Sequence, residues 1–245
     1  MKITIAHLYY DLCNLYGENG NVKALKYALE SQGINVTIQF LTINDTLHFD
    51  DYDLVYIGMG TEENRKLVLN HLKTYQKEIK KKIEENKFFL ITGNAIELFG
   101  TSIEEENGKK IKCLNIFPFH AKEESFRMAD EALLKCDFLN NYVLGFQNQG
   151  SVIKDNQTPM FEVLKGIGSY PKSKGEGIHY KNFYGTYVIG PLLVRNPEFL
   201  QYLVKKLIQS KKEDYKFKKF HFELETKAYE HFIESHYKEY KKEPM

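Results

Sequence analysis

Short apolar runs and longer segments of helical periodicity alternate along the first hundred residues. The runs are rich in β-branched and aromatic residues, as strands covered on both faces are. The segments between them place apolar residues three or four positions apart, which predicts amphipathic helices. This alternation predicts an α/β fold in which helices flank a doubly wound, mostly parallel sheet. The predicted strands span 2–8, 34–41, 53–57 and 88–92, and the predicted helices span 21–32 and 62–85.

The second half of the chain has a less regular pattern. We found neither an internal repeat nor a linker, so we expect residues 1–245 to form a single domain. A helix is expected to start at Asn196-Pro197-Glu198, where an N-cap residue, a proline and an acid stand in order. The remaining predictions are strands at 113–120, 142–146 and 184–191, a polar turn at 146–150, an exposed loop at 166–177 and a last helix after about 213.

The stretch 88–100 predicts a buried strand that runs into a tight turn and then a helix. Gly93 supplies the backbone freedom that a sharp strand-to-helix elbow requires. In α/β enzymes such an elbow displays a nucleophile. No Cys or Ser stands on this one.

Charge and composition exclude several classes of function. With 34 basic and 33 acidic residues the net charge is +1, which argues against nucleic-acid binding, including binding through the lysine-rich segment 211–219. No apolar run is long enough to span a membrane, and the chain passes from Met1 directly into a strand pattern. The three cysteines have no metal-ligand spacing and fit a reducing compartment. We therefore expect a cytoplasmic protein with no metal and no cofactor.

Several segments give the chain a family resemblance. They are Asn14-Leu15-Tyr16 with Gly20-Asn21, the stretch Asp53 to Gly60, the end of the elbow at Leu98-Phe99-Gly100, and Gly177 to Asn182 followed by Gly185-Thr186-Tyr187 and Gly190-Pro191. In this order and spacing they resemble the class I glutamine amidotransferases of the CobB/CobQ type. The resemblance is greatest to the glutaminase subunits of lipid II isoglutaminyl synthases, and it implies a flavodoxin-like fold.

The resemblance implies glutaminase chemistry in which an elbow thiolate attacks the glutamine amide, a histidine carries the proton and backbone amides hold the oxyanion. It also implies a Mur-ligase-like partner that uses the released ammonia in cell-wall metabolism. The family pattern places the nucleophile at Gly93 and the base at Ile189, and neither side chain can do that chemistry. The oxyanion-side loop is Gly58-Met59-Gly60, whose methionine is expected to fill space that glutamine would occupy. Arg127 matches the arginine that holds the glutamine α-carboxylate.

Two interpretations remain open. The first is a catalytically inactive homologue that acts as a binding or regulatory subunit of a Mur-ligase-like enzyme, with glutamine or a related amino acid as a possible ligand at Arg127, Gly58 and Gly60. The second is an active amidotransferase or amidohydrolase with a relocated nucleophile such as Cys13. His179 is a candidate base in the second interpretation and a structural residue in the first.

Overall fold

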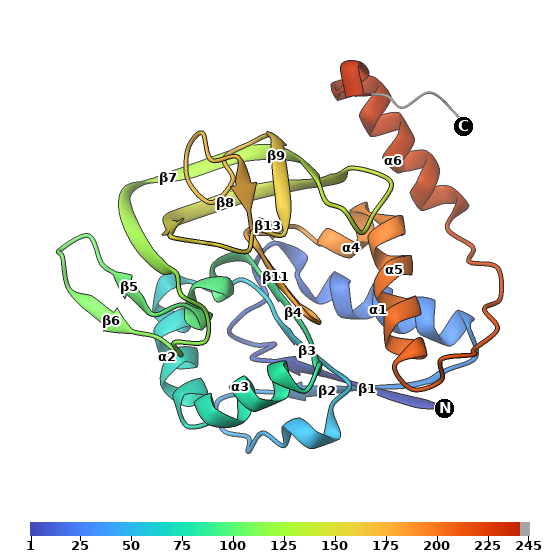
Figure 1. Cartoon of the computed structure of the whole chain (residues 1–245), viewed down its shortest axis with the longest axis horizontal. Coiled ribbons are helices and arrows are strands. Elements are labelled where there is room, and N and C mark those ends of the chain that lie inside the picture. The colour runs from blue at the N-terminus through green and yellow to red at the C-terminus, as the bar shows by residue number, and fades with distance from the viewer. Residues whose placement is uncertain (241–245) are drawn as a thin grey trace.

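The computed structural model describes residues 1–240, and its centre is a six-stranded sheet, here called sheet A (Figure 1). The strand order is β11-β12-β4-β3-β1-β2. All neighbouring strands are parallel except β11 and β12. This order confirms the predicted doubly wound, mostly parallel sheet. The strands are β1 (Lys2–Leu8), β2 (Asn35–Leu41), β3 (Leu54–Ile57), β4 (Phe88–Thr92), β11 (Ile178–Tyr180) and β12 (Phe183–Thr186).

Helices cover both faces of sheet A because successive side chains of its central strands point in opposite directions. In β3, Leu54 and Tyr56 join a core with α1 and α5, whereas Val55 and Ile57 join a core with α2 and α3. In Figure 1, α1 and α5 lie on one side of the sheet, and α2 and α3 lie on the other. They are α1 (Asn19–Ser31), α2 (Glu62–Lys73), α3 (Gln76–Glu84) and α5 (Pro197–Gln209).

The prediction of one helix over 62–85 was wrong, because the helix is interrupted between α2 and α3. Tyr75 leaves helical geometry, with φ −107° and ψ 8°. Its ring packs edge-on against Phe49 and His71, and its hydroxyl accepts a hydrogen bond from the Leu47 amide at 3.1 Å. These long-range contacts override a local periodicity that continues without a break.

A second sheet, here called sheet B, lies across the carboxyl ends of the sheet A strands and was not predicted (Figure 1). The predicted strand at 113–120 is irregular chain, and the first long strand of sheet B begins only at His120. Sheet B is mostly antiparallel. Its strands are β5 (Ser102–Glu104), β6 (Lys110–Lys112), β7 (His120–Lys135), β8 (Val143–Lys154), β9 (Phe161–Lys165), β10 (Gly175–Glu176) and β13 (Val188–Ile189).

The polar segment 146–150 is the interior of β8 and not a turn. Gln147 is buried there, and its side-chain oxygen accepts hydrogen bonds from the amides of Ile167 and Gly168 at 3.2 and 3.0 Å. These bonds pull the start of the 166–177 segment against the sheet. Ser169 in that segment is buried whereas Tyr170 to Lys172 are exposed, so the prediction of an exposed loop over 166–177 holds only in part.

The C-terminal part begins as predicted, with Asn196 before α5 and Pro197 in its first turn. A short helix, α4 (Leu192–Arg195), precedes it, and α6 (Glu223–His236) extends from the body of the molecule in Figure 1. Within residues 1–240 no helix combines the length and hydrophobicity needed to cross a membrane. The single domain over 1–245 stays a prediction, and its last five residues lie outside the described part. The remaining elements are the 3₁₀ helices η1 (Leu15–Gly17), η2 (Phe49–Asp51), η3 (Gly93–Phe99) and η4 (Lys238–Tyr240).

Candidate functional site

The elbow is present, and Gly93 adopts the left-handed conformation, with φ +64°. It follows β4 directly and opens η3, so the predicted helix is a 3₁₀ helix. A Cβ atom on Gly93 would lie 2.8 Å from Cγ and 3.1 Å from Sδ of Met59, and closer still to the Met59 Cβ. Both residues are buried. Met59 therefore fills the space into which a side chain at the elbow would project.

The loop Gly58 to Gly60 is held tightly between the elbow and the segment after β1. A Cβ on Gly58 would lie 2.5 Å from the Cys13 carbonyl oxygen, and one on Gly60 would lie 2.7 Å from the Leu12 carbonyl oxygen. From the elbow side, the Asn94 amide donates to the Gly60 carbonyl at 2.8 Å and accepts from its N–H at 3.2 Å. The two glycines thus permit close backbone approach, and Met59 has little freedom to leave.

Glu18 is the central residue of the site, and the sequence analysis did not single it out. Its carboxylate is fully buried and accepts hydrogen bonds from the hydroxyls of Tyr56, at 2.8 Å, and Thr92. It also accepts from the backbone amides of Gly190, at 3.0 Å, and Met59. Burial raises the pKa of Glu18, and these donors partly offset that effect. The sequence offered one signal, an acid in the polar loop after the first strand.

Glu18 bonds beside both positions that the family resemblance assigns to the nucleophile and the base, Gly93 and Ile189. Thr92 immediately precedes Gly93, and Gly190 immediately follows Ile189, so one carboxylate bonds next to both. Ile189 is buried in β13 and pairs with Phe146 of β8. The structure therefore places the neighbours of Gly93 and Ile189 on one buried carboxylate, and the roles that the resemblance assigns to these two positions stay a prediction.

A buried ion-pair cluster anchors the elbow helix. Glu97 in η3 pairs with Arg65 of α2, and both side chains are at most 2% exposed. Arg65 also pairs with Glu123 of β7 at 2.5 Å, and the Tyr187 hydroxyl donates to Glu97 at 3.0 Å. Since Glu97 is used in this way, it cannot turn toward Gly93 without breaking its buried ion pair with Arg65.

Glu176 is a third buried carboxylate near the site, and its hydrogen-bond donors among the described residues are all neutral. It accepts from the Thr186 hydroxyl and the Tyr187 amide, each at 2.7 Å, and from the Gly177 amide. Burial raises its pKa to about 7 because these bonds compensate only partly for lost hydration. The bonds fix the Gly185-Thr186-Tyr187 segment that carried part of the family resemblance.

Arg127 lies at the outer edge of the site and is already paired. Its guanidinium contacts Glu62 at 2.5 Å, with both side chains about two-fifths exposed, and reaches the backbone and side-chain oxygens of Asn148 at 3.4 Å. Asn148 in turn donates to the hydroxyl of Tyr16, in the loop after β1, at 2.7 Å. Arg127, which was predicted to bind a ligand carboxylate, is therefore paired with a carboxylate of the protein itself, that of Glu62 in the first turn of α2.

The two alternative catalytic residues have unsuitable surroundings. Burial, with smaller contributions from Asp11 and Glu18, raises the pKa of the Cys13 thiol to about 12, which disfavours the thiolate. The His179 ring stacks on Tyr184 at 4.9 Å and packs against Phe138 at 5.0 Å, and burial lowers its pKa. Both residues have the environment of structural side chains.

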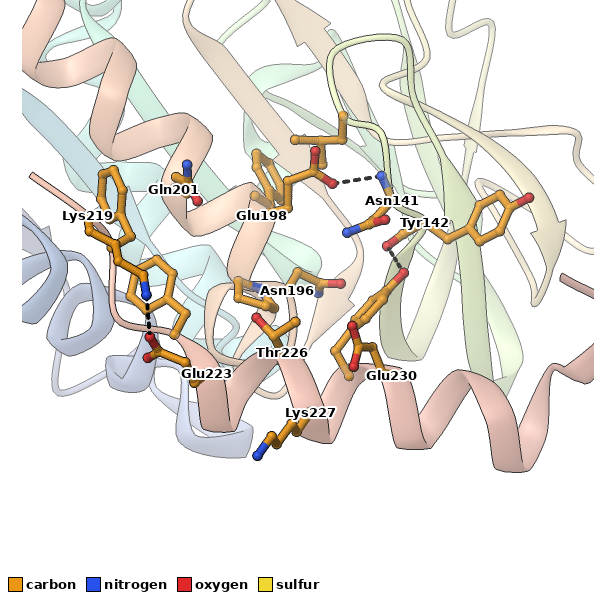
Figure 2. Close-up of a pocket in the computed structure, with 16 residues that line it drawn as sticks. Asn141, Tyr142, Asn196, Glu198, Gln201, Lys219, Glu223, Thr226, Lys227 and Glu230 are labelled. Atoms are coloured by element: carbon orange, nitrogen blue, oxygen red, sulfur yellow. Dashed lines mark hydrogen bonds and ion pairs between the residues drawn. The ribbon is translucent and has the colours of Figure 1, made fainter. Parts of the chain in front are cut away.

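A cavity of about 580 Å³ lies away from the elbow, between α5, α6 and the loop that joins β7 to β8 (Figure 2). Several of the polar groups around it are already bonded to one another. Glu198 accepts from the Asn141 amide at 2.7 Å, and the Tyr229 hydroxyl donates to the Tyr142 carbonyl at 2.9 Å. Across the described chain, no group of three or more His, Cys, Asp or Glu side chains could hold a metal ion.

The fold and this site define the class of protein. Residues 4–197 match the CobB/CobQ-like glutamine amidotransferase domain, and the chain belongs to this family. Two solved glutamine amidotransferases share the fold. One, from Thermotoga maritima, has a TM-score of 0.51 and 12% identity, covering 97% of this chain and 91% of that one. The other has a TM-score of 0.52 and 14% identity, covering 82% and 97%.

Within this family, the chain is similar in sequence over most of its length to two proteins of known name. The chain is 31% identical over 214 residues to the GatD subunit of the glutamine-hydrolysing lipid II isoglutaminyl synthase of Streptococcus pneumoniae strain R6, covering 86% of this chain and 82% of that protein. It is 28% identical over 227 residues to the subunit of the same name from Staphylococcus aureus strain N315, covering 93% of each.

Proposed function

We propose that this protein is a GatD-like subunit that has lost glutaminase activity and acts as a binding or regulatory subunit of a Mur-ligase-like enzyme that amidates lipid II. The observation that carries this proposal is Met59, which occupies the space of a nucleophile at Gly93. Ile189, at the position of the base, is aliphatic and buried. A residue pair that neither attacks a carbonyl nor carries a proton leaves only binding and oxyanion donors.

One backbone amide of the oxyanion-side loop is also engaged. A glutaminase holds its tetrahedral intermediate with backbone amides that are free to point at the developing charge. Here the amide of Met59, in the oxyanion-side loop, bonds to Glu18, which also takes the amide of Gly190. These bonds support loss of the chemistry at a third point, independent of Gly93 and Ile189.

The backbone contacts around the predicted glutamine site are present, which supports a binding role for this region. Gly58, Gly60 and Asn94 still hold the loop against the elbow. Arg127 would accept the carboxylate of glutamine or a related amino acid only after Glu62 moves away. We include the single-domain organisation and a cytoplasmic location in this proposal.

Release of ammonia from L-glutamine, measured with a coupled glutamate dehydrogenase assay, tests the loss of activity. We expect no release above background from the purified protein, alone or with its ligase, while an active GatD relative serves as the positive control. Activity that disappears in a Cys13→Ala variant would establish a relocated nucleophile and overturn the proposal.

Restoration provides a second test of the same site. We expect Gly93→Cys with Ile189→His to remain inactive, because Met59 still fills the space beside residue 93. Adding Met59→Gly removes that obstacle, so any regained activity should require all three changes. Activity in the two-residue variant would show that Met59 does not close the site.

The partner role has a readout that does not depend on glutamine. A Mur-type ligase that amidates lipid II with ammonium salt as nitrogen source can be assayed with and without this protein. We expect the two proteins to copurify and this subunit to change the ligase rate at fixed ammonium concentration. A ligase that neither binds this protein nor responds to it would exclude the regulatory role.

A further inference from the structure

Strand β2 forms an open edge of sheet A. It pairs only with β1 among the described strands, and it ends the strand order of that sheet. Within residues 1–240, β2 makes two backbone hydrogen bonds beyond its pairing with β1. The Asn35 amide donates to the Met1 carbonyl, and the Tyr9 amide donates to the Leu41 carbonyl, so both partners lie next to β1 in the chain. The outer row of N–H and C=O groups over seven residues therefore faces away from the protein.

This edge lacks the features that normally prevent strands from pairing with other chains. Natural edges carry lysines, prolines or bulges, or they are very short. The sequence from Asn35 to Leu41 has no charged residue and no proline, and its register with β1 continues over all seven residues without a bulge. Four of its members, Val36, Ile38, Phe40 and Leu41, are apolar.

The opposite edge of the sheet is managed differently. Strand β11 has only three residues, and the His179 amide in it bonds to the Thr158 carbonyl at 3.1 Å, which covers part of that edge. At the β2 edge, by contrast, Phe40 is 51% exposed and packs edge-on against Tyr10, itself 41% exposed, at 5.4 Å between ring centres. Two exposed aromatic rings thus continue the uncharged edge.

We propose that β2 pairs antiparallel with β2 of a second copy, so that two sheets join across a two-fold axis. A second copy is the occupant that this edge fits, because an uncharged strand meets no repulsion from itself and an antiparallel pair satisfies two-fold symmetry. The Phe40 and Tyr10 rings of each copy then extend the contact beyond the backbone. The contact uses neither Arg127 nor Gly93, so the proposal does not rest on the proposed function.

The proposed contact is small compared with a standard protein interface. Seven residues span about 23 Å at ~3.3 Å per residue. A contact of one strand and two rings falls short of the roughly 800 Å² per partner of a standard interface, so we expect a weak, reversible dimer and take a dissociation constant on the order of 10 µM as the value to test.

Sedimentation velocity of the full chain over a concentration series tests this proposal. We expect a monomer at about 1 µM and a dimer at about 100 µM, bracketing that dissociation constant. Thr37→Lys with Gln39→Lys places like charges on both copies of the strand and should shift the midpoint at least tenfold upward. Tyr27→Lys, at an aromatic residue 61% exposed on α1, is the control and should leave the midpoint unchanged.

A charge-swap pair shows that the strand itself is the interface. Thr37→Glu with Gln39→Glu should likewise shift the midpoint at least tenfold upward, and mixing it with the lysine variant should restore a dimer of one copy of each. Circular dichroism of both variants establishes that they are folded. A monomer at 100 µM, or a dimer that persists unchanged in the folded lysine variant, would overturn the proposal.

Discussion

At Gly93 the backbone keeps the left-handed conformation of a nucleophile elbow, although no nucleophile stands there. This conformation alone disfavours a side chain, and contact with Met59 adds a second, independent obstacle. Gly108 is a control that has the backbone strain without the clash. Its φ is +83°, and no atom lies within 4 Å of an added Cβ. The pair allows the strain of backbone conformation and the clash with Met59 to be measured separately.

We predict that Gly93→Ala destabilises the protein by about 1–3 kcal/mol more than Gly108→Ala does, because only the former overpacks a buried space. Urea denaturation of both variants measures the difference. In a Met59→Gly background the excess should largely disappear, giving a favourable coupling between the two sites. Equal effects of the two alanines would show that Met59 yields without strain.

Glu176 predicts a pH dependence of stability. Its pKa is raised from 4.5 to about 7, so between these values the folded state holds a proton that the unfolded state has released. Stability from this group is therefore fully present below pH 4.5 and is lost as pH rises through 7, up to about 3 kcal/mol in total.

The Glu176→Gln variant isolates this contribution from other titrating groups. We expect its stability, measured by urea denaturation between pH 5 and 8, to fall less steeply with rising pH than that of the wild type. Parallel profiles for the two proteins would mean that Glu176 is already ionised in the folded state at pH 5.

At the scale of elements, α2 takes part in two kinds of arginine–glutamate contact, one around the buried Arg65 and one at the surface. Its Arg65 pairs with Glu97 and Glu123 in the interior, whereas its Glu62 pairs with Arg127 at the surface. Both contacts connect α2 to other parts of the molecule, and the buried one fixes η3 behind the elbow. Burial decides which of them matters for stability.

We predict that Arg65→Met lowers the free energy of unfolding by about 3–5 kcal/mol, because it leaves Glu97 unpaired in the interior. Arg127→Met, the matched surface control, should lower it by about 1 kcal/mol or less. Chemical denaturation of the two variants makes the comparison. Similar losses would mean that water reaches Glu97.

At the scale of the whole molecule, α6 is the α-helix of the described chain that buries the fewest residues. In α6 only Ile233 is buried, whereas α1 buries five residues against sheet A. Figure 1 shows α6 reaching away from the body, at the end of a long connection from α5. Few buried apolar contacts mean a low free energy of local opening.

Hydrogen exchange followed by mass spectrometry should therefore show α6 amides exchanging at least tenfold faster than those of α1. A stable partner that packs on α6 would slow this exchange, and α1 serves as the internal reference in the same sample. Protection of α6 equal to that of α1 in the isolated protein would contradict this prediction.

The sequence by itself determined the parallel sheet, its crossover helices and the elbow at Gly93. These features rest on local periodicity and on short-range backbone requirements, both of which can be read from the order of residues along the chain. The family pattern also identified Gly93 and Ile189 as substituted positions, because a missing functional group is visible in a sequence. Their loss of function stays a prediction.

Only the tertiary structure decided which side chains surround Gly93. Sheet B was missed because its polar β8 side chains, such as Gln147, are satisfied by partners about twenty residues away. Glu18, between Thr92 and Gly190, was missed for the same reason, since its hydrogen-bond partners lie up to 172 residues away. Contacts between distant segments leave no periodic trace in the chain, and at this elbow those contacts place Met59 over Gly93.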